Sequence, residues 1–126
     1  MRLINPGPGE ISDRLTILSL KILFGEAAAK DIKHFRNERT MLLTQMRAKT
    51  LNGAWFDAVL ELAAVNAALW HAEDLLKIHR EMGQTQGNTD DIVELAFRLQ
   101  ELNEKRAELV QRINSQAGEP SGAEKL

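Results

Sequence analysis

Apolar residues recur every three or four positions along most of the chain, which is the spacing of one face of an α-helix. Stretches with this pattern lie at about 10–24, 27–49, 54–82 and 90–116. Turn-forming residues separate them. Long amphipathic helices with short connections favour antiparallel packing. The sequence therefore predicts an all-α antiparallel bundle of about four helices, whose last two form a long helical hairpin.

Local signals set the expected helix ends. Asn5-Pro-Gly-Pro-Gly9 predicts a rigid, non-helical lead-in, followed by Glu10 in the first turn of a helix. Gly25 is expected to break or bend the chain. Thr89 is the expected N-cap of the last helix, with acidic residues directly after it.

The first predicted helix is apolar on two sides. One side carries Ile11, Leu15, Leu18 and Ile22, and the other carries Ile17, Leu20 and Phe24. A helix of this kind is either central in its domain or buried at a subunit interface. The second alternative predicts a homodimer.

The composition supports helices and narrows the class of protein. The chain has 126 residues, 44% of them apolar, with no Tyr and no Cys. We expect a single helical domain at 1–116 and a disordered tail at 117–126. The absence of Cys excludes disulfides and removes thiolate zinc ligands. No run of about 18 apolar residues and no signal-like segment occurs, so we expect no membrane span and a cytoplasmic protein.

Charge is divided unevenly between the two parts of the chain. Residues 1–50 hold nine basic and five acidic residues, and 51–126 hold seven and thirteen. Such opposite signs suit two parts that pack together, or that pack against a second copy. Basic residues at 30, 33, 36 and 39 drift around their predicted helix without forming a dense patch, so nucleic acid is not an expected partner.

Polar residues interrupt the apolar stripes at several positions. Asn66 and Glu73 lie one heptad apart on the stripe of the third predicted helix, beside Trp70. Arg106 takes the heptad position between two leucines on the fourth, with Asn103 next to it. Arg39 does the same on the second helix, and Asp13 shares a face with apolar residues of the first. Because packed stripes meet in a bundle, several of these groups should share one interior region.

A buried carboxylate needs a partner, so Glu73 is expected to pair with Arg106 or Arg39 if it is buried. The sequence leaves three interpretations open. The polar set fixes helix register, it lines a pocket for an anionic or polar ligand, or it faces solvent.

Three blocks of the sequence, PGEISDRLTILSLKI at 8–22, VNAALWHAED at 65–74 and LNEKRAELVQRIN at 102–114, resemble an uncharacterised bacterial family of short helical proteins, a domain of unknown function. The resemblance covers about residues 6–115. It implies an all-helical fold and an association with surface-polysaccharide or sugar-transfer functions, and it supplies no catalytic residues. It selects the candidate ligand- or partner-binding residues: Asp13, Asn66, Trp70, Glu73, Asp74, Asn103 and Arg106.

No complete catalytic or metal-binding motif occurs, so no catalytic residue, metal or cofactor is expected. The leading hypothesis is a non-catalytic binding or assembly module, a homodimer that also binds a protein partner or a small polar ligand.

Two enzyme alternatives remain. One is a small all-α enzyme similar to chorismate mutases, in which Arg14, Arg39, Lys77 and Arg106 would surround an anionic metabolite. The other is a Mg²⁺-dependent nucleotide hydrolase that uses Asp91-x-x-Glu94 and Glu101-x-x-Glu104.

Overall fold

The computed structural model describes residues 6–47, 51–83 and 86–116, and within these ranges the chain forms helices and no strand. The helices are α1 (Pro8–Ala27), α2 (Lys33–Met46), α3 (Gly53–Glu81) and α4 (Gln86–Gln116). The predicted all-α fold with four helices is confirmed.

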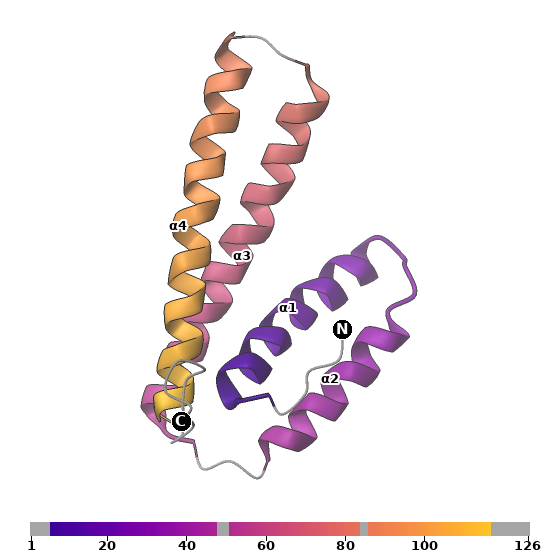
Figure 1. The fold of residues 1–126 in the computed structure, drawn as a ribbon. Helices are drawn as coiled ribbons and strands as arrows, with labels where there is room; N and C mark the ends of the chain where they lie inside the picture. The colour runs from indigo at the N-terminus through magenta and orange to yellow at the C-terminus, as the bar shows by residue number, and fades with distance from the viewer. Residues whose placement is uncertain (1–5, 48–50, 84–85, 117–126) are drawn as a thin grey trace.

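Two helical hairpins make up the described part of the chain (Figure 1). The long helices α3 and α4 run antiparallel, and the shorter α1–α2 hairpin lies beside the end of this long hairpin that holds the start of α3. The half nearest the α3–α4 connection, 71–81 and 86–101, extends beyond α1 and α2; we call it the stalk.

The core has two connected parts. Between α3 and α4, side chains spaced three and four residues apart interlock: Ala58, Leu62, Val65, Leu69, Leu102, Leu109 and Ile113. A smaller cluster joins α1 to α2 through Ile11, Leu18, Leu42 and Met46. Trp55 of α3 packs against both clusters. Since α1 contacts all three other helices, its two apolar sides are explained by a central position.

Helix α1 is longer at both ends than predicted. It begins at Pro8, because proline suits the first helical position and the Glu10 carboxylate accepts a hydrogen bond from the Gly7 nitrogen at 3.1 Å. Gly25 does not break the helix, which continues to Ala27. A Cβ on Gly25 would lie 2.5 Å from Cγ2 of Ile32, so the glycine instead makes room for the returning chain.

The predicted end of the second helix, at 49, lies outside the described residues, and its predicted start at 27 is wrong because α2 begins at Lys33. The predicted cap Thr89 is also wrong, since α4 begins at Gln86. Asn88 joins the two long helices instead. Its Oδ1 lies 2.6 Å from Nδ1 of His79, and its Nδ2 donates to the His79 carbonyl at 2.7 Å. The predicted tail, 117–126, lies outside the described residues.

Candidate functional site

Asp13 of α1 and Arg106 of α4 form a bidentate ion pair. Arg106 Nη2 donates to Asp13 Oδ2 at 2.6 Å, and Nε lies 2.9 Å from Oδ1 and 3.1 Å from Oδ2. The Asp13 side chain is 15% exposed and that of Arg106 is 34% exposed. The hydrogen bond to Asp13 raises the pKa of Arg106, burial opposes this rise, and the charges of Asp13 and Glu73 add to it.

Asn66 extends this pair to α3. Its side chain is buried, and Nδ2 donates to Asp13 Oδ1 at 2.9 Å and to Thr16 Oγ1 at 2.7 Å. The Thr16 hydroxyl in turn donates to the Asp13 carbonyl at 2.8 Å. The network therefore ties three helices together at one point, and the amide that interrupts the apolar stripe has hydrogen-bond partners. We call Asp13, Thr16, Asn66 and Arg106 the polar joint.

A second polar cluster holds the start of α1 on the end of α4. The buried Asn114 accepts a hydrogen bond from the Gly9 nitrogen at 2.7 Å and donates to both Glu10 carboxylate oxygens at 3.0 Å. A Cβ on Gly9 would lie 2.2 Å from the Val110 carbonyl oxygen, so only glycine allows this approach. Sequence reasoning missed Asn114, although it follows Asn103, Arg106 and Val110 at helical spacing.

The other predicted residues lie outside the joint. Trp70 stacks on Phe24 of α1, with ring centroids 5.3 Å apart. Glu73 and Asp74 are exposed, so the burial on which the expected pairing of Glu73 with Arg106 or Arg39 depended is not met. The reason is that α1 extends along α3 only about as far as Trp70. The part of α3 that carries Glu73 is therefore not covered by α1.

A groove of about 380 Å³ borders the joint between α1 and α4. Ala107 and Val110 supply its apolar lining, and its polar lining is Glu10, Asn103, Arg106, Gln111 and Asn114. Arg106 Nη1 makes no hydrogen bond within the described part of the chain. One carboxylate, one guanidinium and several amide groups around a small apolar area suit a polar ligand without net charge.

The cations of the chorismate-mutase alternative do not form one cluster. Arg14 pairs with Glu38 of α2 through bonds of 2.7 and 2.9 Å. This contact raises the pKa of Arg14 and lowers that of Glu38, while burial opposes both shifts. Arg106 is paired with Asp13, and Arg39 and Lys77 are exposed on α2 and α3.

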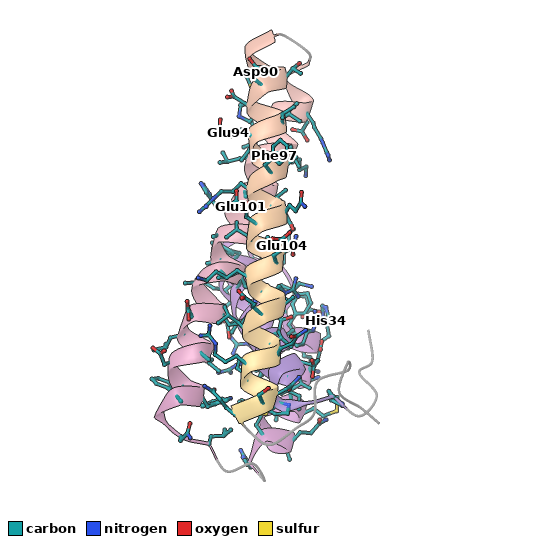
Figure 2. The ribbon with its side chains drawn as sticks, turned by 60° about the vertical axis from the view of Figure 1, so that its left-hand side comes forward. His34, Asp90, Glu94, Phe97, Glu101 and Glu104 are labelled. Carbon is teal, nitrogen blue, oxygen red and sulfur yellow. The ribbon has the colours of Figure 1, made fainter. Side chains whose placement is uncertain are left out.

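The carboxylates of the hydrolase alternative lie along one helix. Glu94, Glu101 and Glu104 are exposed on α4 (Figure 2). Across 6–47, 51–83 and 86–116, no group of three His, Asp or Glu side chains is arranged to hold a metal ion. Among these residues, no helix has the length and apolar character needed to cross a membrane.

Comparisons with family models, curated proteins and solved structures find no match to this chain. The resemblance to the bacterial helical family therefore stays a prediction.

Proposed function

We propose that this protein is a non-catalytic helical assembly module that forms a homodimer through the outer face of α3. The observation that carries the proposal is an apolar surface on the first two-thirds of that helix. Residues 53–70 contain only two charged side chains, Asp57 and Glu61. Yet Phe56 and Leu60 are each 55% exposed, and Ala64 and Ala67 beside them are exposed too. A helix that is apolar on nearly all sides belongs inside a larger assembly.

The order of large and small residues on this face suits a two-fold axis. In an antiparallel pair of α3 helices centred near residue 62, Leu60 of each copy meets Ala64 of the other. The same symmetry brings Phe56 level with position 68, next to Ala67. A self-complementary patch of this kind is what an isologous dimer requires.

The size of the apolar face of α3 sets the expected affinity of the proposed dimer. Eighteen helical residues span about 27 Å, and a helix is about 10 Å wide. A strip of these dimensions covers roughly 270 Å² of each copy, well below the roughly 800 Å² per partner of a standard specific interface. The proposed dimer is therefore concentration-dependent rather than permanent.

Sedimentation equilibrium over a range of concentrations tests this proposal. We expect Leu60→Glu to raise the dimer dissociation constant at least tenfold. Met41→Glu is the matched control, because Met41 is a similarly exposed apolar residue on α2, at 61%. Equal effects of the two substitutions, or a wild-type monomer at every concentration, would contradict the proposal.

A second candidate function is supported by the groove beside the polar joint. We propose that it binds a small hydroxyl-rich ligand such as a sugar, in keeping with the sugar-transfer association that the family resemblance implies. The partly exposed Arg106 and the exposed Asn103 carry this candidate. Titration with glucose should shift the side-chain NMR signals of both residues, and Asn103→Ala should weaken binding several-fold. If their signals move no more than those of Gln45, which is exposed on α2, this candidate fails.

A further inference from the structure

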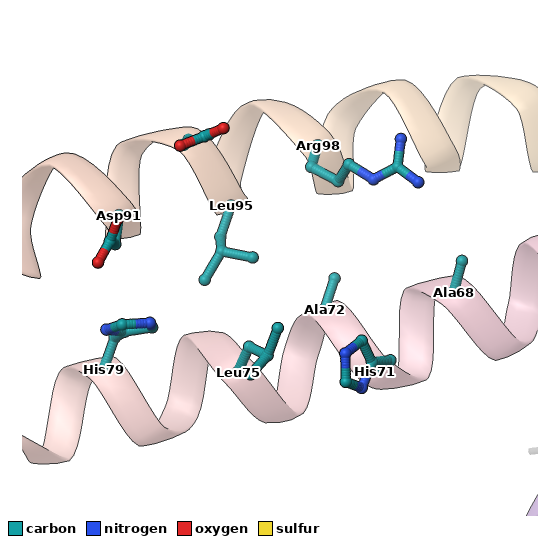
Figure 3. Close-up of a pocket in the computed structure, with 9 residues that line it drawn as sticks. Ala68, His71, Ala72, Leu75, His79, Asp91, Leu95 and Arg98 are labelled. Carbon is teal, nitrogen blue, oxygen red and sulfur yellow. The ribbon is translucent and has the colours of Figure 1, made fainter.

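A second groove, also of about 380 Å³, runs between α3 and α4 and lies mostly in the stalk (Figure 3); we call it the stalk groove. Ala68, Ala72, Leu75 and Leu95 form its apolar lining. Ala68 lies two positions after Asn66, which contacts α1, and is therefore about 200° further around α3. The stalk groove thus lies on the opposite face of the long hairpin from α1.

Carboxylates dominate the α4 side of this groove. Asp91 and Glu94 line it together with Arg98, and Glu101 follows one turn later (Figure 2). Within the described residues none of these three carboxylates is in an ion pair. Among the lining residues of α4, two negative charges against one positive charge give this rim a net negative charge, and Glu101 adds a further negative charge beyond the groove.

The half of the α3–α4 hairpin outside the stalk shows that this hairpin can bind a further helix. There α1 packs against both α3 and α4, so the hairpin accepts a third helix along its length. In the stalk no helix of the described chain covers the groove. Small side chains at Ala68 and Ala72 leave room for the approach of another helix.

We propose that the stalk groove binds an amphipathic helix of a partner protein whose flanks are basic. The apolar side chains of that helix pack between Ala72, Leu75 and Leu95, and its lysine or arginine side chains face Asp91 and Glu94. Charge decides against a second copy of this chain in the same groove, because two acidic rims facing each other would repel.

The test uses a fluorescent 18-residue peptide of leucine and lysine in helical periodicity, with a leucine–glutamate peptide of the same pattern as its counterpart. Fluorescence anisotropy should show binding of the lysine peptide at least tenfold tighter than that of the glutamate peptide. The double variant Asp91→Lys/Glu94→Lys should weaken binding of the lysine peptide at least tenfold.

The matched control is Glu104→Lys/Glu108→Lys, which changes the net charge equally at exposed α4 positions outside the groove. It should weaken binding less than threefold. If both double variants lose the same affinity for the lysine peptide, the effect comes from net charge alone and the proposal is overturned. Absence of binding by the lysine peptide to the natural chain would also overturn it. If a dimer instead dissociates in Asp91→Lys/Glu94→Lys, the groove belongs to a second copy. Because Leu60→Glu tests dimerisation separately, failure of one proposal leaves the other standing.

Discussion

Gly9 and Asn114 are 105 positions apart in the sequence, and the backbone nitrogen of Gly9 donates a hydrogen bond of 2.7 Å to Oδ1 of Asn114. This contact brings the start of α1 against the end of α4 so closely that no Cβ fits at Gly9. The arrangement of the two hairpins depends on it, and on the polar joint one turn further along α1.

Gly9→Ala is therefore expected to be strongly destabilising. The new Cβ meets the Val110 carbonyl, which is backbone and cannot rotate away. Overpacking and a disturbed hydrogen bond should together lower the free energy of unfolding by about 2–4 kcal/mol, measured by urea denaturation. At Gly53 a Cβ would have no neighbour within 4 Å. Gly53→Ala should thus leave stability unchanged or raise it by up to about 1 kcal/mol. Similar losses at both glycines would contradict the docking that we describe.

A double-mutant cycle tests the ion pair in the joint. Asp13→Leu leaves Arg106 without its carboxylate, and Arg106→Met leaves Asp13 without its guanidinium. Each single change should cost about 1–3 kcal/mol, because it strands a partly buried charge. The double variant should cost less than the sum by at least about 1 kcal/mol, measured by chemical denaturation. Strict additivity would mean that the two groups do not interact in solution.

The Arg14–Glu38 pair predicts a dependence of stability on pH. The folded state lowers the pKa of Glu38. Its stabilising contribution is therefore present above the ordinary glutamate pKa and is lost as the pH falls through the lower, folded-state value. The difference in unfolding free energy between wild type and Glu38→Gln should be at most about 1 kcal/mol at neutral pH and should vanish in acid. Glu104→Gln, which removes an exposed carboxylate outside any ion pair of the described residues, is the control. A difference in unfolding free energy between wild type and Glu38→Gln that grows as the pH falls would contradict this prediction.

Ser12 offers a stabilising change. Its side chain is buried, and its Oγ finds no hydrogen-bond partner among the described residues. Ser12→Ala should raise the melting temperature, because it removes a polar group that lost its water on folding. At the exposed Ser19, whose Oγ donates to the Leu15 carbonyl, the same substitution should have little effect. A lower melting temperature for Ser12→Ala would show that the hydroxyl has a partner.

The helices and much of the polar joint could be predicted from the sequence, because both follow from the spacing of residues along one face of a helix. Asp13, Asn66 and Arg106 interrupt apolar stripes, and stripes that pack together bring such residues to one place. Periodicity says nothing, however, about how far one helix extends beside another. Glu73 is exposed because α1 does not cover that part of α3, so the condition for its expected pairing is not met.

The contact of Gly9 with Asn114 could not be predicted for a different reason. A glycine near a helix start is ordinary in sequence terms, and only the tertiary approach of Val110 makes it necessary. The contact of Asn88 with His79 was missed for a similar reason. Thr89 has the sequence signal of an N-cap, but α4 begins at Gln86, before both residues.

The central claim, that this chain assembles through the outer face of α3, is tested most directly by cysteine pairing. The natural chain has no cysteine, so an introduced thiol reports only its own position. Mixing Leu60→Cys with Ala64→Cys under mild oxidation should give mixed disulfide dimers. Mixing Leu60→Cys with Ala96→Cys, an exposed position on α4, should not. Efficient disulfide formation in the first mixture alone is the result that we predict. Equal yields in both mixtures, or none in either, would contradict the claim.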